Sequence, residues 1–253
     1  MSLDLGEALL VAGAGFLAGG VNAVAGGGSL ISFPALLAVG YPSVTANVTN
    51  TVSILPGYVG GAYGYRRELR GQGDRLRRLA PVSVLGAAAG ATLLLTTSSD
   101  VFDLVVPFLV ALASVLLLAQ PRIQQWVLSR PHDGFARSRG ALALTAFAAA
   151  VYGGYFGGGL GVILLAVLGM FLAGDLQHTN ALKSALTLVI NLVAMVAFAL
   201  FGPVQWVAVA IVAPASLVGG WVGAQVARRL RADVLRATVA AFGFAVAVVL
   251  LVR

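Results

Sequence analysis

Lys183 is the residue whose type and position point most directly to chemistry. It is the only lysine in the chain, and it stands near the start of a long apolar segment. A cation inside a membrane is costly and usually faces a cavity or a charged partner, and no acidic residue stands one helical turn away. An unpaired ammonium in a polar cavity suits an anion. The alternative is that Lys183 extends its side chain to the membrane interface, since it lies only about one turn inside the segment.

Two glycine triplets are the second candidate feature, because each one begins a short apolar segment. They are Gly26-Gly27-Gly28, which lies between Asn22 and Ser29, and Gly157-Gly158-Gly159. Glycine permits backbone conformations closed to other residues, so a membrane helix can break there. A break exposes N–H groups at the positive end of the next half-helix, which together form an anion site. The competing interpretation is close helix packing through small residues.

Two stripes of polar residues follow the triplets, one in each half of the chain. Besides the candidates named at the end of this paragraph, the stripes contain Thr45, Thr49, Ser53 and Thr187. Their hydroxyl and amide groups can donate hydrogen bonds to the oxygens of an anion. They can equally bond between helices or cap a helix start, so both interpretations stay open. The asparagines are the better ligand candidates, because an unsatisfied amide is expensive in lipid. The residues that we select beside Lys183 are Asn47, Asn50, Thr51, Thr179, Asn180, Ser184 and Asn191.

The composition is that of a membrane protein. Of 253 residues, 59% are hydrophobic and only 10% are charged, whereas a soluble domain carries about 25% charged residues. The net charge of +7 does not indicate nucleic-acid binding, because the arginines cluster between or after apolar segments. There is no cysteine, metal-ligand cluster or phosphate-binding loop, so we predict no metal, no cofactor and no catalytic residue.

Ten apolar segments predict an all-α polytopic membrane fold. The second and seventh are shorter than the roughly 17–25 residues of a spanning helix, so each is half of a broken helix or an arm of a re-entrant hairpin. We therefore predict eight to ten spanning segments. The ten ranges are approximately 6–25, 27–40, 44–64, 79–97, 102–119, 140–156, 158–173, 179–200, 205–227 and 234–252.

The sequence contains an internal repeat. Pro81, Ser83, Gly86, Gly90 and Ala91 recur at one constant spacing as Pro214, Ser216, Gly219, Gly223 and Ala224. Because the glycines within these runs are four apart in otherwise regular apolar sequence, we assign them to helix packing. The chain then divides into a first repeat at 1–120, a cytoplasmic linker at 121–139 and a second repeat at 140–253.

Charge predicts opposite orientations for the two repeats. The loop at 66–78 holds six arginines, whereas its counterpart around 199–211 holds no charge. The loop at 96–101 has no basic residue, whereas its counterpart at 228–236 has four arginines. Since arginine-rich loops stay inside, the sign of this bias predicts inverted repeats with both termini outside the cytoplasm.

The sequence contains few titratable residues that could couple transport to proton movement. Every aspartate and glutamate lies near the end of a segment, so a carboxylate proton relay has no carrier. His178, at the start of the eighth segment, is the only titrating candidate besides Lys183. The remaining histidine, His132, belongs to a solvated loop.

The paired glycine motifs give the chain a family resemblance over nearly its whole length. The motifs are 19–34 (GGVNAVAGGGSLISFP) with 44–51 (VTANVTNT), and 153–161 (GGYFGGGLG) with 178–183 (HTNALK). They resemble the sulfite exporter TauE/SafE family, also called the toluene sulfonate uptake permease group. The resemblance implies a multi-pass transporter of the prokaryotic inner membrane, which moves sulfite, sulfonates, sulfoacetate or related anions.

The hypothesis from sequence is a secondary transporter whose two broken segments meet near the midplane around a small anion. The membrane potential alone favours anion export, so an exporter needs no coupling ion. The alternatives are a cation-coupled importer of organic anions, a passive anion channel and, least favoured, an intramembrane enzyme pairing Ser29 with His178. The expected partners are the small anionic substrate and the lipid bilayer, and the oligomeric state does not follow from the sequence.

Overall fold

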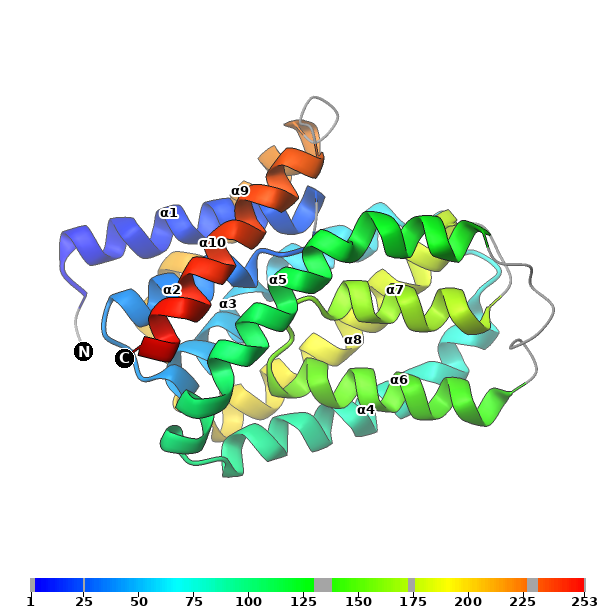
Figure 1. Ribbon diagram of the computed structural model, residues 1–253, viewed down its shortest axis with the longest axis horizontal. Helices are drawn as coiled ribbons and strands as arrows, with labels where there is room; N and C mark the ends of the chain where they lie inside the picture. Colours follow the sequence, from blue (N-terminus) through cyan, green and yellow to red (C-terminus); the bar gives the residue numbers. More distant parts are fainter. Residues whose placement is uncertain (1–2, 25, 130–137, 173–175, 227–231, 253) are drawn as a thin grey trace.

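The computed structural model describes residues 3–24, 26–129, 138–172, 176–226 and 232–252. Ten α-helices account for most of these residues, and they correspond one for one to the ten predicted segments (Figure 1). Their bounds are α1 Leu5–Val24, α2 Ser29–Ala38, α3 Ser43–Gly64, α4 Gly73–Thr96, α5 Ser99–Ser129, α6 Arg139–Tyr155, α7 Leu160–Phe171, α8 Leu176–Phe201, α9 Trp206–Val226 and α10 Ala232–Val252.

Six of the helices in the described residues are long and apolar enough to cross a membrane: α1, α4, α5, α8, α9 and α10. The apolar helices α2 and α7 are too short, with 10 and 12 residues. Helix α6 has only 17 residues, and α3 carries the first polar stripe. The number of spans among these four helices therefore depends on how they lie relative to the bilayer.

The two short helices are arms of hairpins. Helix α2 folds back along α1, and α7 folds back along α6 (Figure 1). The turns contain Gly26, Gly157 and Gly159 with φ angles of 79°, 78° and 74°, in the left-handed region that side chains other than glycine rarely adopt. The triplets therefore end one helix and reverse the chain before the next helix begins.

The helices pair in a pattern that repeats between the two halves. Helix α1 packs on α9, and α6, its counterpart, packs on α4. In the same way α3 packs on α9 as α8 packs on α4, while α3 contacts α8 and α5 contacts α10. The halves therefore interlock, because each hairpin packs against a long helix of the other half.

Glycines permit the closest of these helix crossings. A Cβ atom added to Gly19 would lie 1.9 Å from the Ser216 carbonyl oxygen, and one added to Gly219 would lie 1.9 Å from that of Phe16. At the α4–α6 crossing, a Cβ on Gly90 would lie 2.0 Å from the Val151 carbonyl oxygen. The interpretation of Gly90 and Gly219 as packing residues is thus confirmed.

Helix α5 extends beyond its predicted segment at 102–119. The prediction ended at Gln120 and Pro121 because they are polar or helix-breaking, yet the helix continues to Ser129 with Pro121 inside it. Gln120 is buried, and its Oε1 accepts a hydrogen bond of 3.1 Å from Arg236 Nε of α10. The end of apolar sequence therefore marks where the helix becomes polar, not where it stops. Of the predicted linker at 121–139, residues 130–137 lie outside the described part of the chain.

Candidate functional site

A small cavity of about 90 Å³ lies where the turns of both hairpins meet α3 and α8. Two glycines far apart in sequence, Gly26 and Gly157, line the same cavity, so the structure brings the two glycine triplets together as predicted. The complete lining is Asn22, Gly26, Gly57, Tyr58, Ala62, Gly157, Leu160, Gly161, Lys183, Ser184 and Thr187.

Lys183 is the only charged residue among those that line this cavity. It lies about two turns into α8, which begins at Leu176, and its half-buried side chain packs beside Gly161 of α7. Within the described ranges it forms no ion pair and no hydrogen bond. The cavity therefore holds one positive charge that no carboxylate of the described residues balances. This is the arrangement that the cavity interpretation of Lys183 requires.

Two further polar groups of the cavity lack partners. Asn22 Nδ2 and Thr187 Oγ1 are both buried and make no hydrogen bond within the part of the chain described here. The other amide atom of Asn22, Oδ1, accepts a hydrogen bond of 2.8 Å from the Gly28 N–H and so holds the first hairpin turn. Leaving a buried donor unsatisfied costs about 1–3 kcal/mol, so an Asn22 amide and a Thr187 hydroxyl in this state are suited to a bound acceptor.

The first turn of α7 adds the positive end of a helix dipole. Leu160 and Gly161, its first two residues, line the cavity. The Leu160 N–H donates a hydrogen bond of 3.2 Å to the Gly157 carbonyl, so this turn contributes the positive end of the helix dipole and not a free Leu160 donor. No residue of the first turn of α2 lines the cavity, because the Asn22 side chain already occupies the Gly28 N–H there. The first turn of α7 therefore lies at the cavity, whereas the first turn of α2 does not line it.

The remaining triplet glycines are packing positions. A Cβ on Gly27 would lie 2.7 Å from the Leu117 side chain, and one on Gly28 would lie 2.2 Å from the Ala18 carbonyl oxygen. A Cβ on Gly158 would likewise contact the side chains of Phe156 and Ala113, and one on Gly159 would contact Leu116. Each triplet thus combines both interpretations: Gly26 and Gly157 shape the cavity, and the others allow the chain to pack.

Most of the selected polar residues lie outside the cavity, and two of them, Asn47 and Asn50, join helices. Asn50 Oδ1 accepts a 2.5 Å hydrogen bond from Ser32 Oγ of α2, and Asn47 Nδ2 donates one of 3.0 Å to the Tyr155 carbonyl at the end of α6. Both amides therefore fix the hairpins to α3. The others that do not line the cavity are Ser29, Thr51, Thr179, Asn180 and Asn191, all of which are buried.

Sequence reasoning missed Tyr58 and did not select Thr187. Tyr58 lies seven residues after Thr51, and Thr187 lies four after Lys183, so both extend the polar stripes along one helix face. Helical spacing was the signal that could have found them. The cavity face of Tyr58 also reaches Ser29, with which it hydrogen-bonds. His178 is exposed and does not line the cavity; its carbonyl accepts a 2.8 Å hydrogen bond from Gln72 Nε2.

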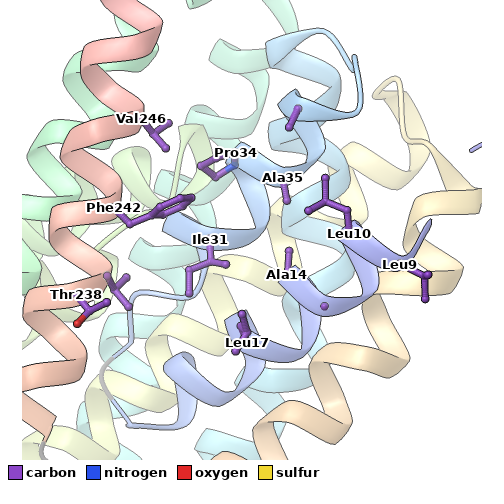
Figure 2. Close-up of a pocket in the computed structure, with 13 residues that line it drawn as sticks. Leu9, Leu10, Ala14, Leu17, Ile31, Pro34, Ala35, Thr238, Phe242 and Val246 are labelled. Atoms are coloured by element: carbon purple, nitrogen blue, oxygen red, sulfur yellow. The ribbon is translucent and has the colours of Figure 1, made fainter. Parts of the chain in front are cut away.

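A larger cavity of about 680 Å³ lies on the outside of the first hairpin, between α1, α2 and α10 (Figure 2). Hydrocarbon side chains such as Leu10, Ile31 and Phe242 form its walls, and Thr238 is its only polar side chain. Its lining residues carry no charge, and only Thr238 has a side-chain group that can donate a hydrogen bond to an anion. Size alone therefore does not identify the anion site, and the smaller polar cavity is the candidate.

Comparisons with known proteins place the chain among membrane transporters. The family profile described as "Sulfite exporter TauE/SafE" matches residues 11–250. A "Probable membrane transporter protein" of Haemophilus influenzae is 26% identical over 239 residues, which cover 91% of this chain and 89% of that protein. "Probable membrane transporter protein YfcA" of Escherichia coli K12 is 27% identical and covers 85% and 77%. "Probable membrane transporter protein ORF9" of a Sinorhizobium species is 28% identical and covers 94% and 90%.

No solved structure matches this chain. The family match spans both hairpins, all six candidate membrane spans and the polar cavity between them. The relatives match over most of their own length and bear transporter names. This multi-pass membrane protein therefore belongs to the sulfite exporter TauE/SafE family of membrane transporters.

Proposed function

We propose that this protein is a secondary carrier that exports a small sulfur oxyanion, such as sulfite or a short sulfonate, through the cavity at Lys183. The observation that carries the proposal is the composition of that cavity. It combines one unbalanced ammonium, two buried donors without partners among the described residues and the first turn of α7. All four features favour a negatively charged, oxygen-rich ligand.

The cavity volume supports a small substrate. Sites for drug-sized ligands measure about 300–1,000 Å³, whereas this cavity measures about 90 Å³. A pyramidal oxyanion or a one-carbon sulfonate suits this space, and an aromatic sulfonate would require the hairpins to separate. We therefore expect sulfite and methanesulfonate to compete for transport, and toluenesulfonate to compete weakly.

Opposite helix directions in the two halves support an inverted repeat, the plan on which the proposed carrier mechanism depends. Helix α1 starts at the same end of the molecule at which α10 finishes, and α6 starts at the opposite end (Figure 1). Counterpart helices α1 and α6 thus run in opposite directions, as do α5 and α10 (Figure 1). The arginine-rich segment at 66–78 lies opposite the two ends of the chain, which supports extracytoplasmic termini in a prokaryotic inner membrane.

Alternating access would follow from rocking one hairpin and its partners against the other around a fixed site. Gly26 and Gly157 belong to different halves, so such a motion would open the cavity to one side at a time. None of the described residues that line the cavity is a carboxylate, and the export that we propose is driven by the membrane potential without a coupling proton.

The test is efflux of sulfite from proteoliposomes under an imposed inside-negative potential. A carrier for a monovalent anion should approach an outside-to-inside ratio of about 50 at 100 mV, since the potential contributes about 2.3 kcal/mol per charge. Saturation with substrate and counterflow of labelled sulfite are expected. Linear flux without counterflow would instead identify a channel, and flux that requires an imposed cation gradient would identify a coupled importer.

Thr187→Val is expected to lower sulfite transport about tenfold while leaving the fold intact. The variant keeps the shape of the side chain and removes a hydroxyl that has no partner in the described residues, so it deletes a hydrogen bond to the anion alone. Ser83→Ala is the matched control, because Ser83 Oγ is also buried and unpartnered but lies outside the cavity. Equal transport by both variants would remove Thr187 from the site.

A further inference from the structure

A third cavity, of about 250 Å³, lies between the starts of α4 and α6 and the end of α7. It is separate from the cavity at Lys183, and the two share no lining residue. Its lining consists of Arg75, Arg78, Leu79, Ser138, Arg139, Leu142, Ala143, Phe171 and Leu172.

One end of this cavity is strongly positive. Among the described residues that line it, three are arginines and none is a carboxylate. Arg78 and Arg139 are exposed, and neither forms an ion pair with any residue that the structure describes. Arg75 has an interaction partner of its own. The helices α4 and α6 both begin here, at Gly73 and Arg139, so their dipoles add to the positive potential. Two adjacent guanidinium groups without partners are suited to a phosphate, which they can bind in a bidentate manner.

The other end of the cavity is apolar. Leu79 is buried one residue beyond Arg78 on α4, and Phe171 is buried at the end of α7. Leu142, Ala143 and Leu172 complete this wall. The lining therefore changes from arginine to hydrocarbon along the first turns of α4 and α6. A membrane protein shows this change where the polar surface of the bilayer meets its hydrocarbon core.

We propose that this cavity binds an anionic phospholipid, with the lipid phosphate between Arg78 and Arg139 and an acyl chain against Leu79, Leu142 and Phe171. A free phosphate would satisfy the arginines but leave the apolar wall without a ligand, whereas a phospholipid satisfies both. Basic pockets between helices at the membrane surface are suited to such headgroups. The bound lipid would join α4 to the start of α6 and the end of α7, and so stabilise the second hairpin.

The experiment is a binding titration of the full-length protein in a neutral detergent, measured by native mass spectrometry and thermal unfolding. The probes are phosphatidylglycerol, phosphatidylcholine and inorganic phosphate. Phosphatidylglycerol is expected to bind and to raise the unfolding temperature more than phosphatidylcholine does, and inorganic phosphate is expected to have no effect. Losing each arginine should weaken binding roughly fivefold, so Arg78→Gln with Arg139→Gln should weaken it about 25-fold.

Arg77→Gln is the matched control, because Arg77 carries the same charge on the same turn of α4 but does not line the cavity. It should bind phosphatidylglycerol like the unaltered protein. Equal weakening by Arg77→Gln and by the double variant would overturn the site in favour of general surface attraction. Stabilisation by inorganic phosphate alone, or equal binding of the neutral and anionic lipids, would overturn the proposed ligand.

Discussion

Replacing Lys183 with methionine is expected to reduce sulfite flux in proteoliposomes to the level of empty vesicles. Methionine has nearly the length and shape of lysine without its charge, so the cavity would keep its volume and lose its only cation. Removing the charged partner of a buried ion typically costs about 3–5 kcal/mol, which corresponds to a loss of binding of roughly two to four orders of magnitude. The measurement is initial flux at a fixed potential, with protein content matched between vesicles.

The variant should fold as well as the unaltered protein or better. Lys183 has no ion pair or hydrogen bond among the described residues, so methionine removes an uncompensated charge without breaking a contact. Lys183→Arg serves as the control for charge, and we expect it to keep measurable flux because the cation remains. If Lys183→Met transported sulfite as the unaltered protein does, Lys183 would not be part of the binding site.

Valine at Gly19 or Gly90 is expected to prevent the helices from packing and to remove most of the folded protein. Even a first side-chain carbon would lie 1.9 Å from the Ser216 carbonyl oxygen or 2.0 Å from that of Val151. These are backbone atoms, so relief requires whole helices to separate. Gly19 lies in the α1–α9 crossing and Gly90 in the α4–α6 crossing, which are the closest approaches of hairpin to long helix in the two halves.

The measurement for these variants is the yield of monodisperse protein after detergent extraction, together with its unfolding temperature. Gly13→Val is the matched control, because Gly13 lies on α1 but an added Cβ would meet nothing within 4 Å. We expect nearly normal yield from Gly13→Val and little or no folded protein from Gly19→Val. Equal stability of the two variants would contradict the described α1–α9 crossing.

The sequence predicted the helices and the centre of the site because hydrophobicity and charge are strong signals in a membrane. The ten apolar runs, from which eight to ten spanning segments were predicted, coincide with the ten helices of the described residues. The cost of an intramembrane cation singled out Lys183, which lines the polar cavity. The glycine triplets correctly indicated breaks, since only glycine adopts the left-handed backbone of Gly26 and Gly157 without strain. The fixed spacing of Gly90 and Gly219 in the repeat correctly indicated close packing.

The function of individual polar residues could not be predicted, because it depends on neighbours that are distant in sequence. Asn47 and Asn22 are both intramembrane amides, yet Asn47 bonds to the Tyr155 carbonyl while Asn22 is left with an unpartnered N–H group at the cavity. Nothing in the local sequence distinguishes them. Tyr58 was missed for a related reason, because a tyrosine in an apolar run resembles any other core aromatic until the opposite wall is known.

The most direct test of the proposed site is crystallographic localisation of selenite, the heavier analogue of sulfite, by its anomalous scattering. We expect one selenium peak in the cavity between Gly26, Gly157 and Lys183, within hydrogen-bonding distance of Thr187. No such peak is expected in Lys183→Met. A peak at another site, or an equally strong peak in the cavity of Lys183→Met, would contradict the assignment of this cavity as the anion-binding centre.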